Sequence, residues 1–429
     1  MTIHPNEPGQ GLAGTLASLF GGDLPVAIRA YDGSHAGPSD ASATLVIRSP
    51  DAVRRVLSSP GELGMARAYV AGDIELDGDI YVALAALGEQ LVDGFRRPQS
   101  WGALARLVRG TGGLRRAPEP PEEEIRLHGR RHSRSRDAAA IAHHYDLSGD
   151  FYRLILGPAM TYSCAVWEDP SVGLDAAQEA KYDLICRKLG LVPGMRLLDV
   201  GCGWGGMAMH AARNYGVRAV GVTLSREQAE LARRRVADAG LADRVEIRLA
   251  DYREVDDGPY DAISSIGMFE HVGADQLGRY FSRMHALLAP QGRLLNHGIS
   301  RPAGQGPIKP NSFLARYVFP DGELEEIGTV VSAIQYAGLE VRHVENLREH
   351  YALTLRAWVR NLEESYTEAV RLAGAGRARV WRLYLASSAL GFERGELEIY
   401  QTLAVRAAAG SSGMPWRPDW EQPRRLLQA

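Results

Sequence analysis

The chain has few cysteines and no long apolar run. Only three cysteines, Cys164, Cys186 and Cys202, occur among its 429 residues. They are too few and too scattered for a disulfide framework or a zinc site, so we expect no metal and a reducing, cytoplasmic location. No apolar run reaches the roughly 20 residues of a membrane-spanning helix, and the first residues lack the pattern of a secretion signal. Any membrane contact is therefore expected to be peripheral.

The chain has little excess of charge of either sign. The net charge is −3, which gives no sign of a nucleic-acid partner. Lysine occurs only at positions 181, 188 and 309; the other basic residues are arginines, a bias that we attribute first to codon usage. The composition is 45% hydrophobic and 24% charged, as in a globular protein, and the length predicts two domains.

One stretch carries most of the functional information. The apolar run at residues 197–200 is typical of a strand buried in a parallel sheet. Glycines follow at 201, 203 and 205, and without a Cβ such a turn lets the backbone approach a ligand closely. Residues 207–215 are expected to form the next helix. A strand, a glycine turn and a helix together form the nucleotide-cradling unit of doubly wound α/β folds.

The spacing in this turn argues against a dinucleotide. A dinucleotide site needs G-x-G-x-x-G to seat a pyrophosphate, whereas this strand ends at Asp199 in the pattern Asp-x-Gly-x-Gly. A carboxylate repels phosphate and suits a cationic ligand. The pattern resembles the first motif of class I methyltransferases, which use S-adenosylmethionine, a ligand with an ammonium and a sulfonium. The alternative is an ordinary glycine turn.

Further strands support the first interpretation. Residues 218–222, 245–249, 260–266 and 292–299 are expected to be strands, and the succession of β–α units predicts a parallel sheet. Polar residues follow these strands directly, where open sheets bind ligands. Ser225 and Gln228 are expected to form a capping box at the start of the helix after the second strand.

The rest of the chain suggests four parts. Residues 1–95 are expected to form a small α+β domain for binding or scaffolding, residues 138–407 the catalytic domain, and residues 408–429 a tail. Residues 96–137 are an Arg-rich linker. It is either a solvated flexible connection or a surface that docks on anionic lipid.

Two segments flank the sheet in the sequence and are expected to cover the site. Residues 141–167 are dense in aromatic and polar groups and are interpreted as a lid. Residues 301–319 contain proline and glycine throughout and are expected to form a loop over the site.

Six motifs occur in the order typical of one enzyme family, over about residues 60–406. They are His144-Tyr-Asp-Leu, Tyr162-Ser-Cys, Asp199-x-Gly-x-Gly-Trp-Gly, Thr223-Leu-Ser-x-x-Gln228, Phe269-Glu-His271 and Tyr351 ahead of Thr354-Leu. In these the chain resembles the cyclopropane-fatty-acyl-phospholipid synthases. The resemblance implies a class I methyltransferase (Rossmann-like) α/β fold with a seven-stranded sheet, preceded by a small α+β domain similar to a lipid carrier. The related mycolic-acid enzymes lack that long N-terminal domain, so its presence favours a phospholipid substrate.

The resemblance also implies where S-adenosylmethionine would bind. Tyr162 and Ser163 would lie near its methionine end, Thr223 and Gln228 near the ribose, and Tyr252 beside the adenine. The full set of implied cofactor contacts is Tyr162, Ser163, Asp199, Gly201, Gly203, Thr223, Gln228, Asp251, Tyr252 and Ile266.

The chemistry of such an enzyme sets requirements of its own. Attack of a cis double bond on a sulfonium methyl leaves a carbocation on the acyl chain. The protein must stabilise it with aromatic faces, exclude water and remove a proton so that the ring closes. The resemblance implies a bound bicarbonate as the base, held by Glu270, His297, Tyr351 and the backbone at Cys164 and Ile299.

Each of these side chains also has a structural interpretation. Glu270 could be a charge at a helix N-terminus, His297 a satisfied core histidine, and Tyr351 a packing residue. Cys164 is not expected to be a nucleophile, because methyl transfer needs none. Ser388 stands where the family often has a cysteine, which puts a thiol role there in doubt.

Three functional outcomes remain open at this stage. The first is cyclopropanation of unsaturated phospholipid chains at the inner face of the membrane. The second keeps methyl transfer but ends in a methyl or methylene branch. The third is a lipid carrier with an inactive methyltransferase fold. The oligomeric state is also open, and a homodimer is one alternative.

Overall fold

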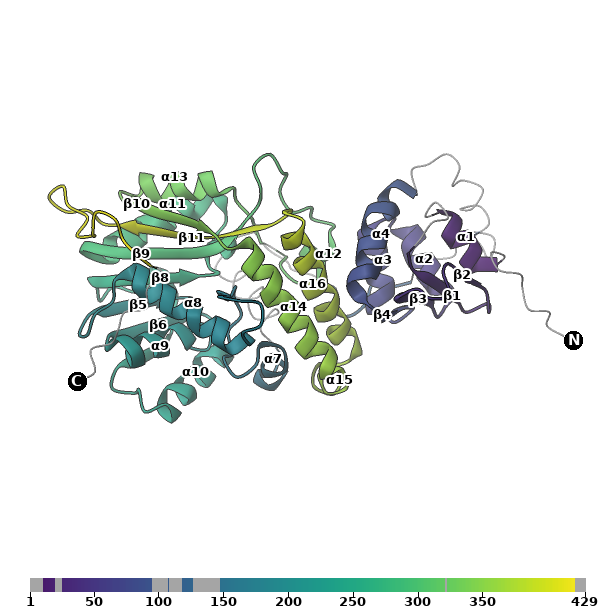
Figure 1. Ribbon diagram of the computed structural model, residues 1–429, viewed down its shortest axis with the longest axis horizontal. Helices are drawn as coiled ribbons and strands as arrows, with labels where there is room; N and C mark the ends of the chain where they lie inside the picture. The colour runs from purple at the N-terminus through teal and green to yellow at the C-terminus, as the bar shows by residue number, and fades with distance from the viewer. Residues whose placement is uncertain are drawn as a thin grey trace, which may run out of the picture. The chain divides into compact units, whose positions relative to one another are not determined.

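The computed structural model describes residues 11–19, 25–94, 107, 118–125, 147–320 and 322–420 (Figure 1). Packing divides the chain into two compact units. The first unit is Met1–Arg126, Lys309–Pro320 and Tyr366–Leu390, and the second is the remainder. The units are not linear in sequence, since two segments of the expected catalytic region pack with the N-terminal unit. The arginines of the expected lipid-docking linker, from Arg126 onward, lie outside the described residues.

The second unit is built on a seven-stranded sheet, as predicted. The strand order is β10-β11-β9-β8-β5-β6-β7. Neighbours from β9 to β7 are parallel, whereas β11 is antiparallel to both β9 and β10. The strands are β5 Arg196–Val200, β6 Arg218–Thr223, β7 Val245–Leu249, β8 Tyr260–Ile266, β9 Leu288–Ser300, β10 Glu340–Asn346 and β11 Glu398–Val405.

Helices cover both faces of this sheet. In Figure 1 α9 (Gly206–Tyr215) and α10 (Arg226–Asp238) lie towards the bottom, α8 (Leu174–Leu189) crosses in front of the strands, and α11 (Leu277–Leu287) and α13 (Ile327–Tyr336) lie at the top. Each layer has its own apolar core, one formed with α8–α10 and the other with α11 and α13. Burial on both faces explains why three of the five residues of β5, Leu197, Leu198 and Val200, are apolar.

The expected capping box forms only in part. The Ser225 hydroxyl accepts a hydrogen bond from the backbone N–H of Gln228 at 3.2 Å, as predicted. The Gln228 side chain does not return to the backbone of Ser225, because its Oε1 accepts from the Thr223 hydroxyl at 2.9 Å. The backbone N–H of Ser225 donates to that same hydroxyl. Thr223 therefore completes the cap and fixes the Gln228 side chain at the end of β6.

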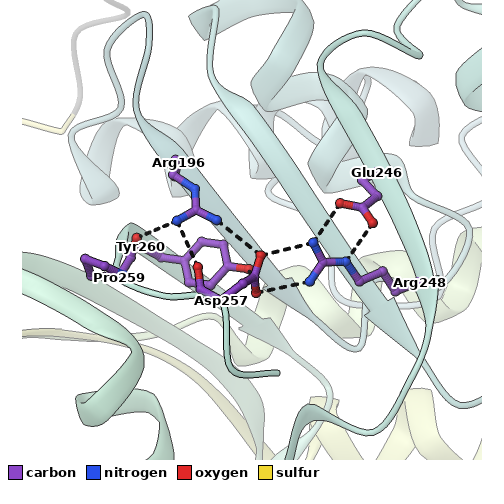
Figure 2. A network of polar contacts seen from close by, with 6 residues as sticks. All are labelled: Arg196, Glu246, Arg248, Asp257, Pro259 and Tyr260. Atoms are coloured by element: carbon purple, nitrogen blue, oxygen red, sulfur yellow. Dashed lines mark hydrogen bonds and ion pairs between the residues drawn. The ribbon is translucent and has the colours of Figure 1, made fainter. Parts of the chain in front are cut away.

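A polar network holds the crossing from β7 to β8 (Figure 2). Asp257 accepts hydrogen bonds from Arg196, Arg248 and the Tyr260 hydroxyl at 2.7–3.2 Å. Arg248 also forms a two-pronged pair with Glu246. Hydrogen bonds from Arg248 hold the pKa of Asp257 well below its usual range. The network ties the connection to Arg196 at the start of β5 and to Arg248 of β7.

The second unit also contains helices outside the two layers. These are α7 (Gly149–Leu156), α14 (Arg348–Glu364) and three short 3₁₀ helices, η2 Tyr252–Glu254, η3 Phe269–His271 and η4 Ala274–Gln276. The helix α14 ends with Ser365 as its C-cap, and the helix that follows it belongs to the first unit.

The first unit contains a four-stranded mixed sheet of order β2-β1-β3-β4. Its strands are β1 Ala27–Ala30, β2 His35–Ala36, β3 Ala43–Ile47 and β4 Ile74–Gly78. Its helices are α1 Gly11–Leu19, α2 Pro50–Ser58, α3 Glu62–Val70, α4 Ile80–Gly94, α12 Phe313–Tyr317, α15 Tyr366–Ala373 and most of α16 Ala375–Glu393.

A buried carboxylate of this unit holds one of its returning segments. The Nε and Nη2 atoms of Arg67 donate to the Glu124 carboxylate at 2.7 Å, and the Tyr317 hydroxyl donates to it at 3.3 Å. Tyr317 lies on α12, so residues expected to form only a loop include a helix, capped by Ser312. Across the described ranges, no helix combines the length and apolarity needed to cross a membrane.

Candidate functional site

A cavity of about 460 Å³ opens at the carboxyl ends of β5, β6, β7 and β8 in the second unit. Nine of the ten predicted cofactor contacts line it, and they come from five separate stretches of the chain. They are Tyr162, Ser163, Asp199, Gly201, Gly203, Thr223, Gln228, Tyr252 and Ile266. The strand topology brings them together, because the carboxyl ends of parallel strands meet at one edge of a sheet.

The glycine turn shapes the cavity floor in two different ways. Gly201 has a φ of +76°, and a Cβ there would lie 2.2 Å from the sulfur of Met268. Gly203 has a φ of +53°, and a Cβ there would meet no atom within 4 Å among the described residues. Gly201 is therefore needed for packing inside the protein. Gly203 keeps backbone accessible beside open space, as a closely approaching ligand requires.

Asp199 places a buried carboxylate at the end of β5. Its Oδ1 accepts a hydrogen bond from the Ser264 hydroxyl at 2.7 Å. Its Oδ2 is buried and has no hydrogen-bond partner within the described part of the chain. Burial raises the pKa of Asp199 to about 6. The carboxylate is mainly ionised at neutral pH, so the unpartnered oxygen favours a cationic or N–H-bearing ligand.

Lys181 is a site residue that sequence reasoning missed. It lies on α8, its side chain is fully buried, and it lines the cavity. Its ammonium donates to the Ser163 hydroxyl at 2.8 Å and lies 4.2 Å from the centre of the Tyr182 ring. Burial lowers its pKa to about 7. The scarcity of lysine was the available signal, since two of the three lysines lie seven residues apart on this one helix.

Asp251 was predicted to contact the cofactor, but its carboxylate binds a neighbouring residue instead. Asp251 does not line the cavity, although Ala250, Tyr252 and Arg253 on either side of it do. Its carboxylate accepts from the backbone N–H of Arg253 at 2.9 Å and from the guanidinium at 2.5–2.9 Å. Asp251 thus caps η2 and orients Arg253 at the cavity wall.

Glu270 lies just beyond β8, on η3, and is buried. Its Oε1 accepts a hydrogen bond from the backbone N–H of Ile299 at 2.7 Å, so two predicted site residues are joined directly. Its Oε2 is buried without a partner within the described ranges. Burial raises the pKa of this carboxyl to about 7. The neighbouring Gly298 is required here, because a Cβ would lie 2.1 Å from the Phe269 ring.

His297 is buried on β9, two residues before Ile299. Its Nδ1 lies 3.3 Å from the side-chain nitrogen of Gln401. Its Nε2 is buried and unpartnered among the residues that the structure describes. Burial, followed by the positive charges of Lys181 and Lys188, holds the pKa of His297 well below its usual range. The ring is therefore neutral and has one nitrogen available for another group.

Cys164 and Tyr351 both donate a hydrogen bond to the backbone carbonyl of Leu347. The Cys164 thiol donates to the carbonyl of Ala165 at 3.2 Å and to that of Leu347 at 3.7 Å. The Tyr351 backbone N–H donates to the same Leu347 carbonyl. Burial raises the pKa of the thiol, which stays protonated. This is consistent with a backbone role for Cys164 and not with a nucleophile.

An aromatic row extends from Tyr351 to the cavity. The Tyr351 ring centre lies 6.0 Å from that of Trp358, and Trp358 lies 5.3 Å from Tyr162. Phe392 packs on the other side of Tyr351 at 4.7 Å. Such π-faces can stabilise a nearby cation. Ser388, by contrast, lies on α16 within the first unit.

His271 is a second cavity residue that sequence reasoning did not assign. It follows Glu270 directly and lines the cavity, and burial lowers its pKa to about 4. Arg279 and Arg283 of α11 also reach the wall. Their positions depend on how α11 packs against the sheet, which no local motif specified.

Comparison with known proteins gives a consistent result. The family model described as mycolic acid cyclopropane synthetase matches residues 132–402. A probable fatty acid methyltransferase of Mycobacterium tuberculosis is 46% identical over 412 residues, covering 93% of this chain and 96% of that protein. The cyclopropane-fatty-acyl-phospholipid synthase of Escherichia coli is 33% identical over 375 residues, covering 85% of this chain and 88% of the relative.

A solved structure extends the likeness to three dimensions. The mycolic acid cyclopropane synthase CmaA1, complexed with SAH and CTAB, is 37% identical with a TM-score of 0.59, and the match covers 62% of this chain and 98% of that one. The predicted class I methyltransferase fold is thereby confirmed for the sheet and its helices. With the motif order, the strand order and these relatives in agreement, the chain belongs to the mycolic acid cyclopropane synthetase family.

Proposed function

We propose that this protein transfers a one-carbon unit from S-adenosylmethionine to the cis double bond of a phospholipid acyl chain and closes a cyclopropane ring. The observation that carries the proposal is a pair of buried, unpartnered polar atoms within the described residues, Glu270 Oε2 and His297 Nε2, at the ends of β8 and β9. Met268 and His271, which flank Glu270, line the cavity. The pair Glu270 and His297, which could accept or donate a proton, is therefore adjacent in the sequence and the sheet to residues that line the ligand cavity.

The cavity residues fit S-adenosylmethionine. The amino acid end of that molecule carries an ammonium and a carboxylate. Asp199 offers an unpartnered carboxylate oxygen within the described residues, and Lys181 with Ser163 offers donors in the same cavity. The opposite charges match a zwitterion, and Gly203 leaves the backbone open to it. When bound, the cofactor supplies an electrophilic methyl group on a sulfonium.

The double bond of the lipid would take up the methyl group supplied by the cofactor. A new C–C bond would form to the methyl carbon as the C–S bond breaks, and a carbocation would remain on the acyl chain. Loss of one proton from the transferred carbon lets the second C–C bond form. The residues of this chain must exclude water and provide π-faces near the cation. The row Tyr162, Trp358 and Tyr351 supplies such faces.

Glu270, His297 and the Ile299 backbone fit a small oxyanion base such as bicarbonate. A bare carboxylate would repel a second anion, but Glu270 with a pKa of about 7 can share a proton with it. His297 can donate from its unpartnered nitrogen. Bicarbonate would accept the proton that leaves the transferred carbon. Glu270 would then hold the base, and His297 would orient it.

The product assay separates the three outcomes that the sequence left open. Purified protein is incubated with S-adenosylmethionine and vesicles of cis-unsaturated phospholipid, and the extracted lipid is examined by proton NMR. Upfield cyclopropyl signals support the proposal. Vinylidene signals without cyclopropyl signals would replace it with branch formation, and lipid binding without any product would favour an inactive carrier. Free unsaturated fatty acid in place of phospholipid tests the substrate class.

We further propose that the enzyme is cytoplasmic and docks peripherally on the inner membrane face, through the N-terminal unit and the basic linker. The N-terminal part is proposed to act as a lipid-carrier-like module, because a mid-chain double bond must leave the bilayer to react. Vesicle binding should rise with anionic lipid and fall with salt. It should weaken when Arg130, Arg131 and Arg134, which lie outside the described residues, become serine. Salt-insensitive binding unaffected by this triple change would contradict the docking role.

A further inference from the structure

A row of polar side chains crosses three strands beneath the proposed proton-removal site. Glu345 of β10 pairs in register with Gln401 of β11, and Gln401 pairs in register with His297 of β9. Lys188 of α8 joins this row from the helix layer. Its ammonium donates to Gln401 Oε1 at 2.7 Å and forms an ion pair with the Glu345 carboxylate.

Three members of the row are almost completely removed from solvent. Lys188 and Gln401 have no exposed surface, and His297 is 1% exposed. Burying an ammonium is costly unless hydrogen bonds and a counter-charge compensate for lost hydration. Glu345, whose side chain is 37% exposed, supplies that counter-charge from the outer end of the row. An apolar side chain would fill the position of Lys188 at lower cost, so the lysine needs a reason beyond packing.

The chemistry of lysine fixes the direction of each hydrogen bond in the row. An ammonium has donors and no acceptor, so the Gln401 atom beside Lys188 must be the amide oxygen. The amide nitrogen then faces His297 Nδ1 at 3.3 Å. An amide nitrogen can only donate, so Nδ1 must accept. A neutral imidazole that accepts at Nδ1 carries its proton on Nε2.

We propose that Lys188 and Gln401 are positioning residues that hold His297 as its neutral Nε2–H tautomer. His297 then presents a hydrogen-bond donor through the one ring nitrogen that has no partner among the described residues. The doubly protonated ring is disfavoured too, because its Nδ1–H would face the amide N–H group. The positive charge of Lys188 acts in the same direction and lowers the pKa of His297. The expected effect of this tautomer on catalysis rests on the proposed function, in which His297 orients the bicarbonate that accepts the proton.

The tautomer can be measured without any turnover. In the full chain with ¹⁵N-labelled histidine, the ring-nitrogen signals of His297 are identified by their loss in His297→Gln. The wild type should show a pyridine-type Nδ1 and a pyrrole-type Nε2. Gln401→Glu keeps the shape but replaces the donor with a carboxylate, so Nδ1 should become protonated. Lys188→Met frees the amide to rotate, and both tautomers should appear.

Kinetics then test what the tautomer does. An imidazole without a proton on Nε2 cannot donate to the bicarbonate base and orient it. General-base assistance is worth ~10²–10⁴-fold, so kcat of Gln401→Glu should fall within that range. Its affinity for S-adenosylhomocysteine should remain near that of the wild type. Arg187→Met is the matched control. It removes a cation next to Lys188 on α8 that pairs instead with Asp183, and it should change neither the tautomer nor kcat.

Failure of the positioning role and failure of the proposed function would give different results in these experiments. A wild-type Nδ1–H tautomer would overturn the positioning role, even if the enzyme makes cyclopropane. If Gln401→Glu does not fold, the spectra of the wild type and of Lys188→Met still show whether Lys188 and Gln401 set the tautomer of His297. A changed tautomer with undiminished turnover would overturn the catalytic half of the inference. The methyl-transfer proposal itself would then be judged by the lipid product and by Glu270→Gln.

Discussion

The state of Glu270 gives the most quantitative prediction from this structure. The carboxyl is buried, and burial raises its pKa from 4.5 to about 7. Between these two pH values the folded protein keeps a proton that the unfolded chain has lost. The free energy of unfolding must therefore fall as pH rises through this window, by about 1.4 kcal/mol per pH unit. Over the whole window the loss is roughly 3 kcal/mol.

Glu270→Gln removes this titration while keeping the shape of the side chain. The difference in unfolding free energy between variant and wild type should shift by roughly 3 kcal/mol in favour of the variant from pH 4.5 to pH 8. Urea titrations of both proteins at intermediate pH values would measure it. Glu227→Gln, which changes an exposed glutamate at the start of α10, controls for loss of a surface charge. A difference that stays constant with pH would refute the reasoning that burial keeps Glu270 protonated.

The same variant also tests the mechanism. Glu270→Gln cannot share a titrating proton with a base, so turnover should fall by ~10²–10⁴-fold. Binding of S-adenosylhomocysteine should be nearly unchanged, because Glu270 does not line the cavity. Higher bicarbonate should partly restore the rate if the variant only weakens binding of the base. Near-normal rate and product in Glu270→Gln would mean that the proton leaves by another route.

Three further perturbations test other parts of the molecule. Gly203→Val should abolish S-adenosylhomocysteine binding in calorimetry, because it adds a branched side chain at a left-handed turn on the cavity wall; unchanged binding would place the ligand elsewhere. Lys181→Met removes a charged donor worth about 1.5–3 kcal/mol and should weaken that binding roughly 10–100-fold, whereas an unchanged dissociation constant would leave Lys181 a structural role. Glu124→Ala should destabilise the protein by about 3 kcal/mol, since it strands Arg67 in a buried pair. Urea unfolding would measure this against exposed Glu122→Ala, and equal stability of the two variants would refute it.

The sequence alone determined the sheet and the turn at its centre. Strands such as β7 (Val245–Leu249) and β8 (Tyr260–Ile266) match the expected residues, because short runs rich in apolar and β-branched residues between turns are visible in the local sequence. The glycines at 201 and 203 were informative for a related reason. Their left-handed backbone conformations strongly favour glycine, so the requirement is written into the residue type itself.

The tertiary structure decided what the polar residues near this turn do. The motif indicated Glu270, but its bond to Ile299 depends on two strand ends meeting, and its raised pKa depends on burial by distant residues. The sequence showed that lysine is scarce, but it did not reveal that Lys181 and Lys188 have structural roles. A lysine is ordinarily exposed, and only the packing of α8 on the sheet shows that both are buried.

The division into units was likewise beyond reach of the sequence. The segments Lys309–Pro320 and Tyr366–Leu390 pack with N-terminal residues far away in the chain. The Glu124 carboxylate draws its partners, Arg67 and Tyr317, from positions 57 and 193 residues away. Local composition records the conformation that each segment prefers, through backbone sterics and side-chain periodicity. It does not record which distant partner compensates a buried charge, because that depends on how the chain folds back on itself.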